Sequence, residues 1–152
     1  MSKPIALHVA LADCGSGVQA EDVWNFIESR GQGFETYQLD ARRVSHAAIE
    51  YIVLLGAAGS VASLAALLWM AYDKYIASKK TPDDAAGIYL AIRKPDGSVV
   101  DFWIGKGYQD RDVFIGEFTR TISDFRSSAK ADSDFEKTEQ EVRLSGLWIR
   151  RK

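Results

Sequence analysis

Few residues of this chain have the side chains that catalysis needs, and the most reactive lies after the first predicted strand. Cys14 is the single cysteine, and it precedes a predicted helix whose N-terminus would lower the pKa of the thiol. Gly15-Ser16-Gly17 follows it and could cradle a phosphate. Neither the Gly-Lys-Ser/Thr of a Walker loop nor a full G-x-G-x-x-G pattern is present. We therefore interpret this stretch as a tight turn of small residues.

The two histidines, His8 and His46, are the other groups that could transfer a proton or bind a metal. Either could pair with a carboxylate such as that of Asp40. Two histidines and one cysteine are too few for most zinc sites, and one cysteine excludes an internal disulfide. We interpret both histidines as structural or surface residues. We predict a protein that is not an enzyme, with no catalytic residue, no metal and no cofactor.

A predicted hairpin carries the residues that most favour a function. Two β-rich runs, 87–93 and 98–105, flank the sequence Lys94-Pro95-Asp96-Gly97. This sequence is typical of a turn, because proline fixes φ and glycine adopts positive φ without strain. Alternation along both runs predicts one apolar face and one face that is aromatic and charged.

Aromatic residues and arginine are enriched at the energetic centres of protein interfaces. The second face of the hairpin is therefore a candidate binding surface; the alternative is a second buried layer under the last helix or the tail strand. We predict that a partner protein is bound by Tyr89, Arg93, Asp101, Trp103 and Trp148.

Composition limits the classes of function. The chain has 152 residues, enough for one domain with a core of its own. Its net charge of −2 argues against broad nucleic-acid binding, which usually needs a basic excess. The N-terminus alternates like a strand and does not have the form of a signal peptide, so we expect a cytoplasmic protein.

The order of the predicted elements, β-α-β-α-β-β-α, favours an α+β fold: a two-layer sandwich with helices on one face of a mixed sheet. The strand at 34–41 has no purely apolar face and is predicted at a sheet edge. We predict one domain over 1–126, a polar linker over 127–141 and a strand-like tail over 142–152. The patterns predict strands at 5–12, 34–41, 87–93 and 98–105, helices at 20–30, 45–78 and 110–126, and an extra C-terminal strand within 142–150.

The predicted helix at 45–78 is the dominant feature, since no charged residue occurs from Tyr51 to Tyr72. Such a run is long enough to cross a bilayer of roughly 30 Å. Two small-xxx-small pairs, Gly56/Ser60 and Gly59/Ser63, are also typical of membrane helices. A spanning helix would, however, divide the strands between two sides of the membrane, where neither half is large enough to be stable. We therefore favour a long, buried, apolar helix, with a membrane-spanning helix as the alternative.

The run from the apolar segment onward consists of GAAGSVASLAALLWMAY, then GIYLAIRKPDGSVVDF, then a predicted helix. It resembles the effector-associated constant component family of bacterial conflict systems, over roughly residues 45–126 and the opening strand region 4–41. The resemblance implies a non-enzymatic adaptor or regulator in bacterial defence that acts with a caspase-like or trypsin-like effector. The polar linker and the C-terminal strand depart from the family pattern.

Two other functions need no catalytic residue either. One is a membrane-anchored sensor or effector component, with residues 51–72 in the bilayer. The other is an immunity-type inhibitor of a toxin.

Overall fold

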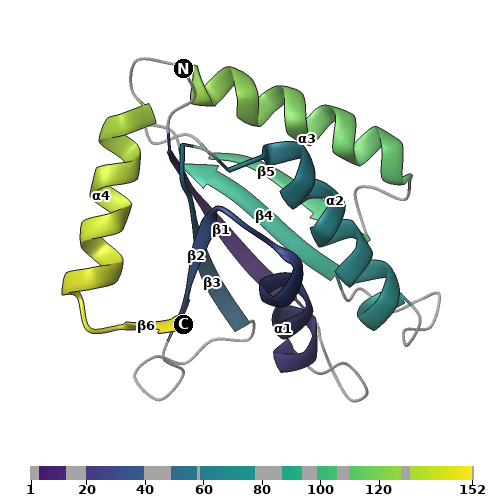
Figure 1. Cartoon of the computed structure of the whole chain (residues 1–152), viewed down its shortest axis with the longest axis horizontal. Helices are drawn as coiled ribbons and strands as arrows, with labels where there is room; N and C mark the ends of the chain where they lie inside the picture. The colour runs from purple at the N-terminus through teal and green to yellow at the C-terminus, as the bar shows by residue number, and fades with distance from the viewer. Residues whose placement is uncertain are drawn as a thin grey trace.

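The computed structural model describes residues 4–12, 20–39, 49–57, 59–77, 87–93, 99–105, 110–127 and 131–151. Figure 1 shows the chain, which forms six strands and four α-helices within these ranges, with one π-helix after the second α-helix. The elements are β1 (Ile5–Ala12), α1 (Ala20–Arg30), β2 (Phe34–Leu39), β3 (Ile49–Leu55), α2 (Val61–Ala71), the π-helix η1 (Tyr72–Ala77), β4 (Gly87–Arg93), β5 (Val99–Ile104), α3 (Arg111–Arg126), α4 (Ala131–Leu144) and β6 (Trp148–Arg151).

The strands form one sheet in the order β5-β4-β1-β3-β2-β6, and every neighbouring pair is antiparallel. The α+β class is confirmed, whereas the predicted mixed sheet is wrong. The elements β1, α1, β2, β3, α2 and β4, with strand order β4-β1-β3-β2, have the ferredoxin-like arrangement. Strands β5 and β6 extend that sheet at its two sides, so β2 is not the edge strand that the sequence predicted.

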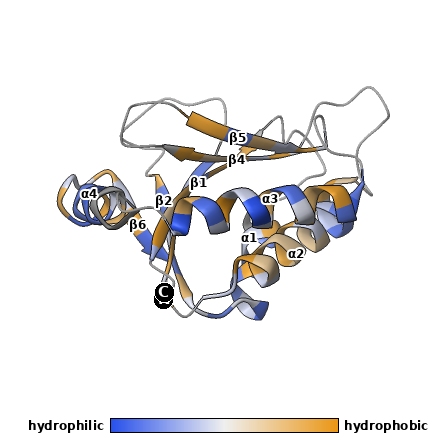
Figure 2. Ribbon diagram, turned by 90° about the horizontal axis from the view of Figure 1, so that it is seen from above, coloured by the Kyte–Doolittle hydropathy of each residue, from blue (hydrophilic) through white to orange (hydrophobic). Residues whose placement is uncertain are grey.

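Helices cover both faces of the sheet. Helices α1, α2 and α3 lie on one face, and α4 lies on the other at the β6 end (Figures 1 and 2). The bulky side chains of β1, among them Leu7 and Val9, are buried in the large core under the first three helices. Ala6, on the small face of β1, packs in a second cluster with Val142 of α4. The predicted two-layer sandwich therefore has a third, partial layer.

The long apolar helix predicted at 45–78 is wrong. Its first part is β3, a short loop follows, and Ser60 caps α2 by accepting a hydrogen bond from the Ser63 N–H at 3.1 Å. Strand β3 lies in the middle of the sheet and is buried on both faces, so Tyr51 to Leu55 are uniformly apolar. Periodicity cannot distinguish such a strand from a buried helix. Among the helices of the described residues, none has both the length and the apolar character needed to cross a membrane.

The polar linker predicted over 127–141 is wrong as well, because most of it belongs to α4. This helix is polar around most of its circumference, and Phe135 and Val142 are the side chains that pack it on the sheet. The predicted C-terminal strand is confirmed as β6, although α4 extends to Leu144 and the strand begins only at Trp148.

The remaining elements agree with the sequence patterns. Helix α1 has the predicted bounds, and both strands of the predicted hairpin are present. Asp110 caps α3 by accepting from the N–H groups of Asp112 and Val113 at 2.9 and 3.1 Å. The predicted turn at 94–97 lies outside the described residues.

Candidate functional site

The hairpin of β4 and β5 brings Tyr89, Asp101 and Trp103 together. Trp103 lies directly opposite Tyr89, and Asp101 lies opposite Ala91. These residues face away from the large core, because the alternate residues of both strands, such as Leu90, are buried in it. We call Tyr89, Asp101 and Trp103 the hairpin patch.

The side chains of the hairpin patch contact one another. The Tyr89 hydroxyl donates a hydrogen bond to Asp101 Oδ2 at 2.9 Å. The rings of Tyr89 and Trp103 meet edge to face, with centroids 5.5 Å apart and planes at 61°. A Cβ on Gly87 would lie 3.3 Å from Trp103 Nε1, so glycine at that position leaves room for the indole at the start of β4.

The hairpin patch lies on the half of the sheet that α4 does not cover. Helix α4 packs mainly against β1, β3 and β6, and the figures show it at the opposite end of the sheet from β4 and β5 (Figures 1 and 2). Tyr89 and Trp103 are half-buried, and Asp101 is exposed. Two aromatic rings beside a carboxylate attract a cationic side chain. The arrangement is therefore suited to bind arginine or lysine of another molecule.

The ionisation of Tyr89 reports on the hydrogen bond within the hairpin patch. Burial raises the pKa of Tyr89 above its ordinary value of 10.0, and the hydrogen bond and the charge of Asp101 raise it further. We expect Asp101→Asn to lower the pKa of Tyr89 while leaving it above the ordinary value, because burial remains. The measurement is an ultraviolet titration of tyrosinate, with the titration of Tyr89→Phe subtracted. An unchanged pKa in Asp101→Asn would show that the two side chains do not interact in solution.

The other two predicted partner-binding residues are Arg93 and Trp148. Arg93 is the last residue of β4, but its side chain lies outside the described part of the structure. Trp148 lies on β6, at the other edge of the sheet, where it packs beside α4. It packs against the smaller buried cluster, which is formed by Tyr37, Ile52, Leu54 and Val142. Trp148 and the hairpin patch are therefore not one surface.

The residues that the sequence offered for chemistry are mostly outside the described ranges. Cys14, Gly15-Ser16-Gly17, His46 and Asp40 belong to segments that the structure does not describe. His8 is half-buried on β1, opposite Ala91 on one side and Ile52 on the other. Within the described residues, no three side chains of His, Cys, Asp or Glu lie close enough together to hold a metal ion.

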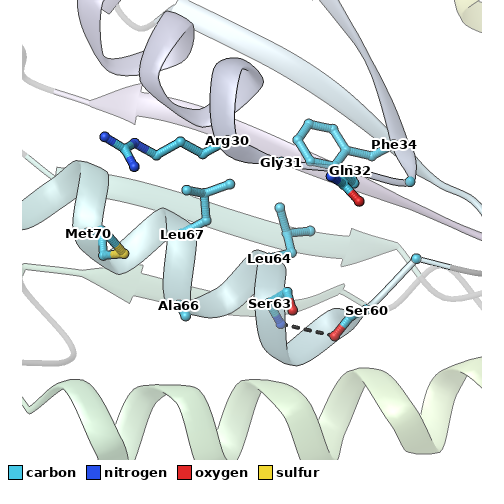
Figure 3. A pocket seen from close by; sticks show the side chains of 12 residues that line it. Arg30, Gly31, Gln32, Phe34, Ser60, Ser63, Leu64, Ala66, Leu67 and Met70 are labelled. Carbon is cyan, nitrogen blue, oxygen red and sulfur yellow. Dashed lines mark hydrogen bonds between the residues drawn. The ribbon is translucent and has the colours of Figure 1, made fainter.

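A groove of about 670 Å³ lies between the end of α1 and helix α2 (Figure 3). Phe34, Leu64 and Leu67 form its apolar part, and Arg30 is its single charged lining residue. Figure 3 shows Arg30 and Met70 at one end of the groove. The groove can receive an apolar group next to an anion, but its lining has no cysteine, histidine or carboxylate. The sequence did not predict this groove. Helix α2, which forms one of its walls, was expected to be part of a continuous helix over 45–78.

A buried arginine holds the loop between β3 and α2 in place by hydrogen bonds. Arg126, at the end of α3, donates from one guanidinium nitrogen to Gly59 O at 2.8 Å. It donates from the other to Gly56 O and Ala57 O, at 2.6 and 2.9 Å. Burial lowers the pKa of Arg126, so the charge has a desolvation cost that these carbonyl oxygens offset.

A second polar cluster attaches β6 to α1. Arg151 Nε donates to Glu28 Oε1 at 2.9 Å, and the Thr36 hydroxyl donates to Glu28 Oε2 at 2.6 Å. The other guanidinium nitrogens of Arg151 donate to Gln38 Oε1 at 2.9 Å and to Asn25 Oδ1 at 3.0 Å. Both arginine clusters join residues far apart in the sequence, and no local pattern indicates either of them. Their role is structural.

Comparison of the chain with protein-family models, with curated proteins and with solved structures found no match.

Proposed function

We propose that this protein is a non-enzymatic protein-binding module and that the hairpin patch is its binding surface. One observation carries the proposal: the Tyr89 and Trp103 rings lie beside the Asp101 carboxylate on the half of the sheet away from α4. Large aromatic side chains supply most of the energy at protein interfaces at a low cost in conformational entropy. The ferredoxin-like arrangement serves many unrelated functions, so the proposal rests on the site and not on the fold.

The partner is a protein that presents arginine or lysine to the hairpin patch. The edge-to-face ring pair provides an aromatic surface, and Asp101 provides a negative charge within reach of the same cation. The resemblance to the effector-associated constant component family supports a caspase-like or trypsin-like effector as this partner. On this basis the protein is an adaptor or regulator in bacterial defence.

We expect Trp103→Ala to weaken binding to the effector by about 30-fold, which corresponds to about 2 kcal/mol for loss of an aromatic anchor. Asp101→Lys should weaken it as well, mainly by slowing association, and the effect should diminish at high salt. The measurements are isothermal titration calorimetry and surface plasmon resonance with the purified protease-type effectors of the source organism.

Val113→Ala is the matched control, because Val113 is a 50% exposed apolar residue on α3, away from the hairpin patch. It should bind like the wild type. If Trp103→Ala bound the effector as tightly as Val113→Ala, the hairpin patch would not be the binding surface. If no protease-type effector bound the wild type, the adaptor function would be wrong.

A further inference from the structure

The groove between the end of α1 and helix α2 has two different ends. At one end its walls touch, because a Cβ on Gly33 would lie only 2.9 Å from Gly59 Cα. Figure 3 shows Ser60 at this end, with Arg30 and Met70 at the opposite end. Arg30 is exposed there, and Met70 is 45% exposed. The groove is therefore closed at the glycine end and open at the Arg30 end.

The walls between the two ends are apolar and firmly held. Leu64 and Leu67 of α2 line one side, and Phe34 at the start of β2 lines the other. Both leucines are buried in the large core, and Phe34 packs against the same core. A Cβ on Gly31 would overlap the Phe34 ring, so glycine at that position lets the ring lie against the end of α1. The groove thus offers an apolar chain a surface that exists before binding.

The two ends offer different partners to an anionic group. At the closed end, the Ser60 hydroxyl accepts from the Ser63 N–H and the Ser60 carbonyl accepts from the Leu64 N–H, both at 3.1 Å. The chain itself therefore satisfies these donors at the start of α2. At the open end, the Arg30 guanidinium lies over the Phe26 ring, 4.8 Å from its centroid. A guanidinium that rests on a ring still presents the N–H groups of its edge, which match a carboxylate.

A second cation lies near Arg30. The Lys74 ammonium is 5.3 Å from the centroid of the same Phe26 ring, so both positive charges lie beside one side chain. Together they make the open end of the groove attractive to a negative charge. The volume of the groove, about 670 Å³, is within the range of about 300–1,000 Å³ that is typical of small-molecule sites. Charge and volume therefore both favour a small anion with an apolar part.

We propose that the groove binds a small amphipathic carboxylate, whose apolar chain lies along Phe34 and Leu64 and whose carboxylate pairs with Arg30. The inference stands apart from the proposed function, because the groove and the hairpin patch lie on opposite faces of the sheet. Helices α1 and α2 cover the face that holds the large core, whereas the hairpin patch faces away from that core. The carboxylate and a protein partner can therefore be bound at the same time.

The test is a titration of the nitrogen-15-labelled full chain with octanoate, followed by the amide resonances in NMR spectra. Octanoate should shift the amides of 30–34 and 60–70 in a saturable manner. The uncharged alcohol 1-octanol has the same chain length and should bind there about fivefold more weakly, because it has no charge for Arg30 to pair with. Arg30→Gln should weaken octanoate binding about fivefold and leave 1-octanol binding within about twofold. Arg120→Gln, an exposed arginine on α3, is the matched control and should change neither.

Phe34→Ala tests the apolar wall separately from the charge. It should weaken octanoate and 1-octanol alike, by about fivefold or more, because both lose the same contact with the ring. The Arg30→Gln arm does not depend on whether Phe34→Ala folds, since Arg30 is exposed.

Three outcomes would overturn the inference. If millimolar octanoate shifted no amide of 30–34 or 60–70, the groove would not bind amphipathic carboxylates. If Arg30→Gln weakened octanoate no more than Arg120→Gln did, the carboxylate would not pair with Arg30. If Phe34→Ala folded and bound both ligands like the wild type, the chain would lie outside the groove.

Discussion

Replacing Arg126 with methionine is expected to lower the free energy of unfolding by about 3 kcal/mol or more. Methionine fills part of the volume but donates no hydrogen bond. The carbonyl oxygens of Gly56, Ala57 and Gly59, bonded to the guanidinium at 2.6–2.9 Å, would then lose their charged donor. A hydrogen bond to a charged group contributes about 1.5–3 kcal/mol, and part of the loss is recovered where water reaches the loop. Urea unfolding, followed by circular dichroism, measures the change.

Arg126→Lys should fall between the wild type and Arg126→Met. Lysine keeps the charge, but its ammonium group cannot hold three carbonyl oxygens in the planar geometry of a guanidinium. Arg120→Met is the matched control, because Arg120 is exposed on the same helix, and its loss should cost no more than about 0.5 kcal/mol. If Arg126→Met unfolded at the same urea concentration as Arg120→Met, Arg126 would not stabilise the loop.

Arg126 also shows why one part of the fold could not be predicted from the sequence. In the sequence, Arg126 is the last residue of an amphipathic helix, and that helix was predicted correctly from its apolar stripe. The sequence places the loop that Arg126 binds in the interior of a long helix. The uncharged run on the two sides of the loop belongs to a strand that is buried on both faces and to an apolar helix. Without a charged residue to mark the boundary, only the glycines at 56 and 59 and the N-cap residue Ser60 indicate a break.

Helix α4 was missed for the opposite reason. Its sequence, ADSDFEKTEQEVRL, has too few apolar residues to predict a packed helix. It is nevertheless attached to the sheet, because Phe135 and Val142 lie one above the other at i and i+7 and reach the small face of β1. The small side chains on this face of β1 leave room for a helix to pack closely, but they do not identify which helix.

The hairpin patch was predictable because it depends on local geometry. A two-stranded hairpin with alternating residues fixes which side chains share a face, so Tyr89, Asp101 and Trp103 could be grouped from the sequence. Trp148 could not be placed in the same way. Its position depends on which strand β6 pairs with, and that pairing is set by contacts with α1 and β2 far away in the sequence.

The contact between Arg151 of β6 and Glu28 of α1 is the basis of the second prediction with a large effect on stability. Glu28→Ala is expected to lower the free energy of unfolding by about 2–3 kcal/mol, which is at or just below the cost of losing one partner from a fully buried ion pair. Both side chains of the pair are largely buried, with Arg151 12% and Glu28 22% exposed. Without Glu28, Arg151 Nε loses an acceptor at 2.9 Å. The Thr36 hydroxyl loses an acceptor at 2.6 Å, and Thr36 is only 1% exposed.

The loss of stability in Glu28→Ala should be concentrated at β6. Arg151 lies opposite Thr36 in the sheet, so weakening its attachment to α1 frees the edge strand before the rest of the sheet unfolds. Hydrogen exchange measured by mass spectrometry should therefore show faster exchange in 148–151 and little change in β1 and β4. Uniformly faster exchange over the whole sheet would show that Glu28 supports the global fold and not the edge strand.

Glu139→Ala provides the comparison for Glu28→Ala. Glu139 pairs with Arg143 at 3.2 Å one helical turn away, but these side chains are 30% and 51% exposed. Solvent screens such a pair, which contributes only about 0.3–0.5 kcal/mol. A cost for Glu28→Ala as small as that for Glu139→Ala would contradict the prediction. The two pairs have nearly the same distance, so a larger cost at Glu28 would follow from its burial and from the additional hydroxyl that it accepts.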